Sequence, residues 1–141
     1  MSSVTGRCNC SAVSVEVKDG VPESTVVSRC TNCGMSSGNL FAILFFAARD
    51  RVVISGQDHI QYYRDMGHRR RQHRAQAFLR PLCPIYGFVE GKEDRILIRA
   101  TLFEPKMLPE PTLELYSKHF EVWEKPHAEA AVFERMTPGL A

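Results

Sequence analysis

The chain has 141 residues, of which 44% are hydrophobic and 24% are charged, and its formal net charge is +2. This length and composition suffice for one core of ordinary size, so we expect a single domain over residues 1–141 with a loose tail at 137–141. A charge balance this close to neutral argues against a chain built mainly to bind nucleic acid or a membrane.

The apolar runs and the cysteine content bear on the cellular compartment. No apolar stretch of signal-peptide length opens the sequence, and the longest apolar run, residues 40–48, is too short to cross a bilayer. We therefore expect a cytoplasmic protein whose thiols stay reduced. The five cysteines, an odd number, also fit a disulfide framework poorly.

Short segments of strand character follow one another along the chain. Val13, Val15 and Val17 alternate with polar residues, which predicts a strand that ends at the Asp19-Gly20 turn. Further strand-like segments lie at residues 25–28, 40–48, 51–54, 59–64, 75–82, 86–90, 95–103, 113–116 and 120–123. Many short strands separated by turns predict a mainly β fold, with small antiparallel sheets that form a sandwich or half-barrel.

Aromatic residues supply candidates for the core. We expect Phe41, Phe45 and Phe46, together with Phe120 and Trp123, to pack in the interior because large aromatic side chains dominate core packing. The Ser36-Ser37-Gly38 segment is typical of a turn that closes the preceding cysteine loop.

The cysteines form two close pairs and one single residue. Cys8 and Cys10 are two apart, Cys30 and Cys33 are three apart, and Cys83 precedes a proline. Two closely spaced thiolates can share one zinc ion, which is how cysteine zinc sites are assembled. Cysteine spacing alone leaves two alternatives open, a redox-active Cys30–Cys33 pair and buried cysteines that act as small apolar residues.

Several motifs together resemble the family of glutathione-dependent formaldehyde-activating enzymes and centromere protein V. Residues 6–13, GRCNCSAV, are similar to the family's opening motif, G-x-C-x-C-G-x-V. Residues 28–38, SRCTNCGMSSG, resemble C-H-C-x-x-C-x-x-x-S-G, and residues 80–87, RPLCPIYG, resemble R-x-F-C-x-x-C-G. Residues 100–103 and 131–136 resemble two later family segments, so the resemblance runs in order along nearly the whole chain.

The resemblance implies a β-tent-like fold around cysteine zinc sites. Carried over by position, Cys8, Cys10 and Cys83 fall in a structural zinc site, and Cys30 and Cys33 fall in a catalytic one. Ser28 and Tyr86 stand where the family has a further cysteine in each site, and hydroxyl groups are poorer zinc ligands than thiolates. We therefore expect one zinc ion, at the structural site.

The other candidate residues could act on an anionic or carbonyl substrate. Residues 67–74, GHRRRQHR, hold four arginines, whose guanidinium groups offer paired donors to carboxylates, phosphates or phenolates, although such a run is more often a solvated loop. We assign substrate binding to Cys30, Cys33, Arg69 and Arg71, and catalysis to Arg29, Tyr86 and His73.

Three functions are open at this point. The resemblance implies a carbon–sulfur lyase that joins a thiol to a small carbonyl compound. The loss of two cysteines favours an alternative on the same fold, a metal-independent acid–base enzyme that cyclises, hydrates or isomerises a small aromatic or carbonyl compound in specialised-metabolite biosynthesis. The third is a zinc-stapled binding module that uses the basic loop. We expect a small-molecule substrate rather than nucleic acid or membrane, and a homodimer is open because sheet edges accept partners.

Overall fold

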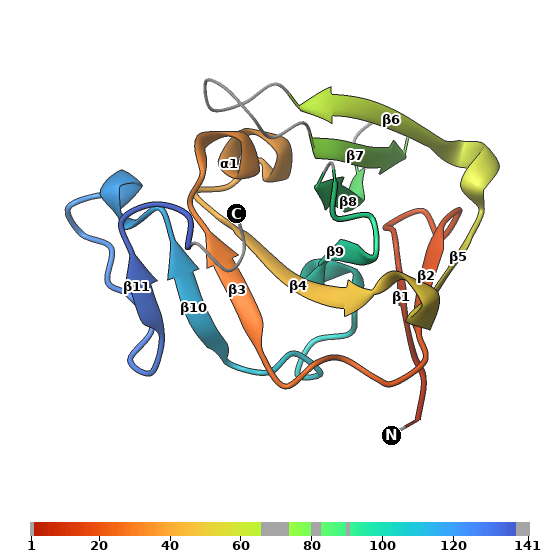
Figure 1. Ribbon diagram of the computed structural model, residues 1–141, viewed down its shortest axis with the longest axis horizontal. Helices are drawn as coiled ribbons and strands as arrows, with labels where there is room; N and C mark the ends of the chain where they lie inside the picture. The colour runs from red at the N-terminus through yellow and green to blue at the C-terminus, as the bar shows by residue number, and fades with distance from the viewer. Residues whose placement is uncertain (1, 66–73, 80–82, 90, 138–141) are drawn as a thin grey trace.

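The computed structural model describes residues 2–65, 74–79, 83–89 and 91–137, and it is mainly β, with two sheets and one short α-helix (Figure 1). The strands are β1 (Val4–Arg7), β2 (Ser14–Val17), β3 (Thr25–Ser28), β4 (Ala42–Ala48), β5 (Val52–Ser55), β6 (Ile60–Asp65), β7 (Arg74–Leu79), β8 (Cys83–Val89), β9 (Arg95–Arg99), β10 (Pro111–Leu115) and β11 (Ala131–Phe133). The helix is α1 (Thr31–Ser37), and the 3-10 turns are η1 (Arg49–Arg51), η2 (Gln57–His59), η3 (Ala100–Leu102) and η4 (Ser117–His119).

The smaller sheet has the strand order β1-β2-β5, and both of its pairings are antiparallel. The predicted alternation holds in β2, since Val15 and Val17 are buried while Ser14 and Glu16 are half-buried. Side chains of a strand point alternately to its two faces, so the valines form the inner face of this sheet.

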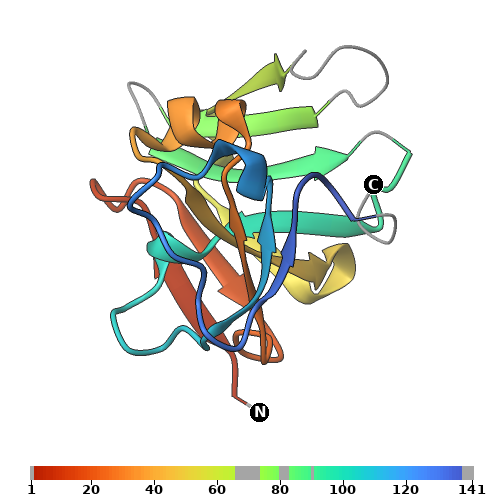
Figure 2. The same ribbon diagram turned by 90° about the vertical axis from the view of Figure 1, so that its left-hand side faces the viewer.

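The larger sheet has the strand order β11-β10-β3-β4-β9-β8-β7-β6 (Figure 1). Most of its pairings are antiparallel, as predicted, but β10 runs parallel to both β3 and β11. Parallel neighbours cannot be joined by a hairpin, so this pairing brings together segments far apart in the chain. Figure 2 shows α1 lying across one end of this sheet, beside β7 and β8.

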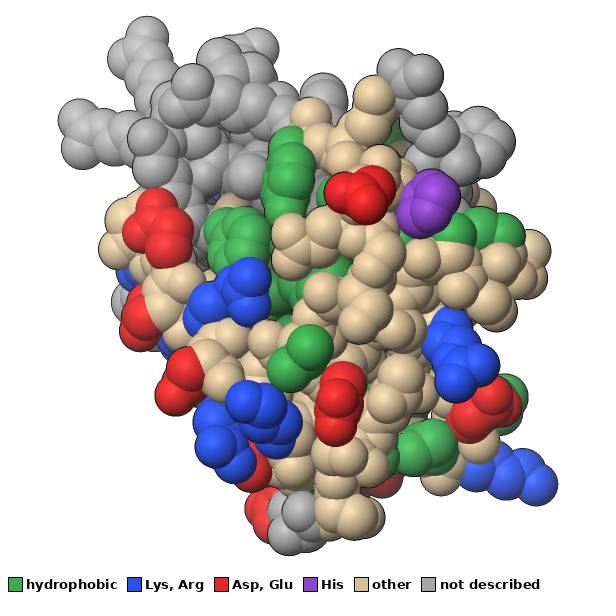
Figure 3. Space-filling view, turned by 90° about the vertical axis from the view of Figure 1, so that its right-hand side faces the viewer, with side chains coloured by type: hydrophobic (Ala, Val, Ile, Leu, Met, Phe, Trp, Pro, Cys, Tyr) green, Lys and Arg blue, Asp and Glu red, His purple; other side chains and the backbone are tan. Residues whose placement is uncertain are grey.

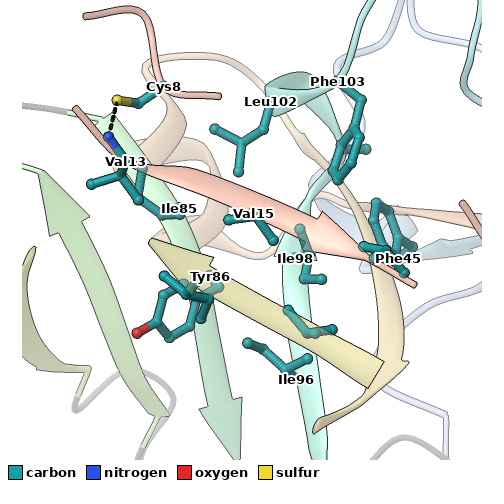
Figure 4. Packing of buried hydrophobic residues seen from close by; sticks show 14 residues of the cluster. Cys8, Val13, Val15, Phe45, Ile85, Tyr86, Ile96, Ile98, Leu102 and Phe103 are labelled. Atoms are coloured by element: carbon teal, nitrogen blue, oxygen red, sulfur yellow. Dashed lines mark hydrogen bonds between the residues drawn. The ribbon is translucent and has the colours of Figure 1, made fainter. Parts of the chain in front are cut away.

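The main core fills the space between the smaller sheet and the central strands of the larger one (Figure 4). Val13 and Val15 face Ile85, Ile96 and Ile98, and all five side chains are fully buried. The rings of Phe45 and Phe103 pack with centroids 5.4 Å apart. The prediction that Phe45 lies in the core is confirmed, whereas Phe41 and Phe46 are only half-buried.

Three local predictions differ from the structure. The strand expected at residues 95–103 ends at Arg99, where η3 begins. Residues 120–123 form no strand, and Trp123 is 69% exposed rather than in the core. The turn expected around Ser36 and Ser37 is the end of α1, and Gly38 caps that helix in the left-handed conformation. No helix in the described ranges has the length and hydrophobicity needed to cross a membrane.

Replacing Gly56 by alanine is expected to destabilise the protein at least twice as much as replacing Gly38. Both glycines have positive φ, which costs an alanine about 1–2 kcal/mol. A Cβ at Gly56 would also overlap the carbonyl oxygen of Ala12, whereas a Cβ at Gly38 meets nothing within 4 Å. Denaturant unfolding of the two variants measures the difference, and equal losses would show that the backbone near Ala12 shifts freely.

Candidate functional site

Cys8, Cys10 and Cys83 gather where the end of β1 approaches the start of β8. The sulfur atoms of Cys8 and Cys10 are 3.7 Å apart, and the backbone N–H of Val13 donates a hydrogen bond to the Cys8 sulfur (Figure 4). Cys8 is buried, Cys10 is exposed and Cys83 is half-buried. A backbone N–H of Asn9 donates to Cys83, so the loop between the first two cysteines contacts the third.

The surroundings shift the pKa values of two of these thiols in opposite directions. Burial opposes ionisation of Cys8, but hydrogen bonds from Val13 and Cys10 outweigh it and lower the pKa of the Cys8 thiol. Burial raises the pKa of Cys83, and the nearby thiols of Cys8 and Cys10 raise it further. Cys83 therefore lies close enough to the first two cysteines for their charges to affect its ionisation.

These thiols match part of a zinc site. Sulfur ligands of a tetrahedral zinc ion lie about 3.8 Å apart when each Zn–S bond is about 2.3 Å, which agrees with the Cys8–Cys10 separation. However, within the described ranges no three His, Cys, Asp or Glu side chains converge closely enough to hold a metal ion. The fourth motif position is Tyr86, whose hydroxyl points away from Cys8 (Figure 4). The residues present therefore fit an incomplete zinc site.

The second cysteine motif forms the start of α1. Cys30 immediately precedes the helix and Cys33 lies in its first turn, and both side chains are buried against Ala42 and Leu44 of β4. Ser28, at the position of the family's further cysteine, is buried at the end of β3. The hydroxyl of Ser37 donates to the carbonyl oxygen of Cys33, which ties the end of the helix to its start.

Tyr86 and Tyr62 form a pair of hydroxyl groups. Tyr86 is buried in β8, Tyr62 is exposed on β6, and their oxygen atoms are 2.6 Å apart. Burial is the main cause that raises the pKa of Tyr86, and the hydrogen bond with Tyr62 raises it further. Tyr86 therefore stays protonated at neutral pH. Because one hydroxyl of such a pair accepts, its own proton remains available to a third group.

A small hollow lies beside Tyr86. Its volume is about 20 Å³, and its lining includes Cys33 of α1, Tyr86 of β8 and Arg99 of β9. This volume is about that of one water molecule or one small functional group. The hollow is thus lined by residues of three elements that are far apart in the sequence.

Arg99 also lines a larger cavity, which has a volume of about 430 Å³. Arg99 is buried, and one guanidinium nitrogen of Arg99 donates to the hydroxyl of Ser36 at 2.7 Å. Cys83 also lines this cavity, so the cavity connects the cysteine cluster with the surroundings of α1. Cavities of this size are typical of sites for small molecules.

Arg29 lies in a buried ion-pair network. Its guanidinium group pairs with Glu114 on β10 and donates to Glu124 at 3.0 Å, and the side chains of Arg29 and Glu114 are 3% and 0% exposed. The rings of Phe41 and Phe120 cover the guanidinium group, with centroids 5.0 and 4.0 Å from its carbon. Arg29 lines neither of the two cavities, so the structure places it in the network rather than beside the hollow.

Two histidines extend this network. The backbone N–H and the ring Nδ1 of His127 donate to the same carboxylate oxygen of Glu114, at 2.7 and 2.6 Å. Burial opposes ionisation of Glu114, but the bonds from His127 and the charge of Arg29 outweigh it and lower the pKa of this carboxyl. His119 Nδ1 donates to the carbonyl oxygen of Arg29 at 2.8 Å. The network ties residues 114–127 to β3.

The structure does not describe the remaining site residues that were predicted from the sequence. His73, Arg69 and Arg71 lie outside the described residues, and so does most of the basic segment. Figure 3 shows the face formed around β5 and β6, on which acidic and basic side chains of the described residues are interspersed.

Sequence reasoning missed Arg99, Glu114 and Tyr62. Arg99 ends an apolar strand, and Glu114 stands between two leucines within a strand. A charged residue in such a position signals a buried partner, because isolated charges are costly to bury. Tyr62 offered no comparable signal, since its role depends on β6 lying two strands away from β8.

The comparisons with known proteins identify the fold and the family. A family model described as glutathione-dependent formaldehyde-activating enzyme matches residues 3–119. A crystal structure of a Rhodobacter sphaeroides protein superimposes with a TM-score of 0.55 at 18% sequence identity, covering 77% of this chain and 97% of that chain. At this identity the likeness speaks for the fold alone. No curated protein matches the sequence.

Proposed function

Because the chain belongs to the glutathione-dependent formaldehyde-activating enzyme family, we propose that it is an enzyme that makes and breaks a carbon–sulfur bond between a thiol and a small carbonyl compound. The observation that carries this proposal is the hollow that Cys33, Tyr86 and Arg99 line. Its volume of about 20 Å³ suits a one-carbon carbonyl group such as that of formaldehyde.

In the forward direction the substrate thiol would attack the carbonyl carbon. The carbon–sulfur bond forms as the carbonyl π bond breaks, and the oxygen takes a proton from the Tyr86 hydroxyl. The proton released by the thiol passes to water, from which Tyr86 is reprotonated through Tyr62.

The test is the formation of the adduct between glutathione and formaldehyde. We expect the purified protein to accelerate the exchange between free and adducted glutathione, observed by NMR on an equilibrium mixture of the two compounds. Heat-denatured protein at the same concentration is the control for uncatalysed exchange. An exchange rate that the native, zinc-supplemented protein leaves unchanged would rule out this proposal.

A second candidate function is supported by the two positions at which the family motifs are altered. Ser28 and Tyr86 replace cysteines, and Tyr86 is engaged with Tyr62 rather than with the thiols. The same phenol could transfer a proton to or from a small aromatic or carbonyl compound without any thiol, in a cyclisation, hydration or isomerisation. Activity on such a compound in the absence of glutathione would favour this candidate.

Zinc, if bound, would have a structural role at Cys8, Cys10 and Cys83. We expect about one zinc ion per chain by elemental analysis of protein purified without added zinc. Because no three described side chains already converge on a metal position, this requires Cys83 to approach the Cys8–Cys10 pair and a further donor to complete the tetrahedral site. Cys10→Ser should lose this ion without disturbing the core, since Cys10 is exposed. About two ions per chain would indicate that Cys30 and Cys33 bind a second zinc with another ligand.

A further inference from the structure

The 430 Å³ cavity has a lining of mixed chemistry. Of the residues that line it, Arg99 and Leu102 are buried and Arg7 is exposed. The side chains of Phe41, Ile43 and Pro84 make its wall partly apolar. The cavity therefore offers hydrogen-bond donors for an anionic group and an apolar surface for the rest of a ligand.

The charges around this cavity have one sign. Two arginines contribute to the lining, and among the described residues that line it there is no aspartate or glutamate. Guanidinium groups bind carboxylates and phosphates through paired, charge-assisted hydrogen bonds. Such bonds are strongest where water is partly excluded, as it is around the buried Arg99.

Arg99 is held in place from two elements. It ends β9, where it pairs in register with Leu44 of β4, and its guanidinium group donates to Ser36 of α1. This anchoring fixes the position of the charge before any ligand enters, which reduces the entropic cost of binding. Arg99 also lines the small hollow beside Tyr86, so the two spaces share this residue.

From these observations we infer that the cavity binds an amphipathic organic anion, with its carboxylate or phosphate between Arg7 and Arg99 and its apolar part against Phe41 and Ile43. The inference rests on the proposed function only where it identifies this anion with the substrate. Binding itself follows from the cavity and its charges, whether or not the compound reacts.

Benzoate is a suitable probe because it combines a carboxylate with an apolar ring, and benzamide is its uncharged counterpart of the same shape. We expect saturable binding of benzoate in an NMR titration, with shifts at the backbone amides of Ser37 and Thr101, which line the cavity. Benzamide should bind at least about tenfold more weakly, because it lacks the charge-assisted hydrogen bonds. Added salt should weaken the binding of benzoate and leave that of benzamide unchanged.

Arg7→Gln tests the location without endangering the fold, because Arg7 is exposed. It should weaken benzoate binding about tenfold or more. Arg51→Gln is the matched control, since Arg51 is also exposed but pairs with Asp19 outside the cavity, and it should leave the affinity unchanged. Equal affinity for benzamide, absence of saturable binding, or benzoate binding that Arg7→Gln does not weaken would each overturn the inference.

This titration separates the inference from the proposed function. It contains no thiol and no carbonyl co-substrate, so an inactive enzyme that binds benzoate through Arg7 contradicts the proposed reaction and leaves the anion site standing. An enzyme that accelerates adduct exchange but does not bind benzoate contradicts the anion site alone.

Discussion

Glu114→Gln is expected to lower the free energy of unfolding by about 3 kcal/mol, the lower end of the range for breaking a buried ion pair. The substitution keeps the shape of the side chain but leaves the buried guanidinium group of Arg29 with Glu124 as its one remaining acidic partner among the ion pairs described. An uncompensated charge in the interior carries its desolvation cost without the attraction that offset it. Equilibrium unfolding in urea measures the loss.

The exposed pair of Asp19 and Arg51 provides the matched control. Their side chains are 59% and 46% exposed, so Asp19→Asn should cost much less stability than Glu114→Gln. The double variant Arg29→Met/Glu114→Leu should recover much of the stability, because apolar side chains remove both charges together. A loss in Glu114→Gln no larger than that in Asp19→Asn would show that the network contributes no more than a surface pair.

The same variant should change the response to acid. The pKa of Glu114 is lowered in the folded state, so its ionised form stabilises the protein above the ordinary carboxyl pKa, and this contribution is lost as the pH falls toward the folded value. Glu114→Gln lacks this titration. The stability difference between the wild type and the variant should therefore shrink as the pH falls below about 4.5.

Tyr86→Phe is expected to lower kcat by about 10²–10⁴, the range that a positioned general acid contributes. The substitution removes one oxygen atom and keeps the ring that packs edge-on against Phe88. Stability should change by no more than about 1.5 kcal/mol, because the exposed Tyr62 hydroxyl can bond to water instead. A large fall in activity with nearly unchanged stability is the signature of a chemical rather than a structural role.

The activity assay needs two companion variants. Tyr62→Phe should cause a smaller fall in kcat, since it removes the hydrogen-bond partner of Tyr86 and leaves the donor in place. Asp19→Asn should leave kcat unchanged, because Asp19 pairs at the surface with Arg51. If Tyr86→Phe retained full activity, the proton would have to come from another group.

The secondary structure was largely predictable from the sequence, and the helix α1 is the exception. The valines of β2 and the apolar run in β4 have strand periodicity and composition, and both form strands. The sequence of α1, TNCGMSS, contains a glycine and two serines, which have low helix propensity. The helix forms because it packs against β4 and β8 and is capped by Gly38. Neither interaction can be predicted from the residues of the helix alone.

Trp123 illustrates the opposite failure. Its size and apolar character predict a core position, yet it is 69% exposed, while nearby Glu124 is buried against Arg29. Pairing Glu124 with a buried charge determines which way this segment faces. The partner Arg29 is 95 residues away, so no local pattern contains that information.

The sequence by itself determined the family, the strand-rich class and the clustering of Cys8 with Cys10, because motif order, alternation and short spacing are properties of the chain. Only the tertiary structure decided that Tyr86 bonds to Tyr62, that Arg29 lies in an ion-pair network, and that Arg99 lines both a hollow and a larger cavity. These arrangements depend on which strands become neighbours. Strand neighbours are selected by the burial of the whole core and not by any one segment.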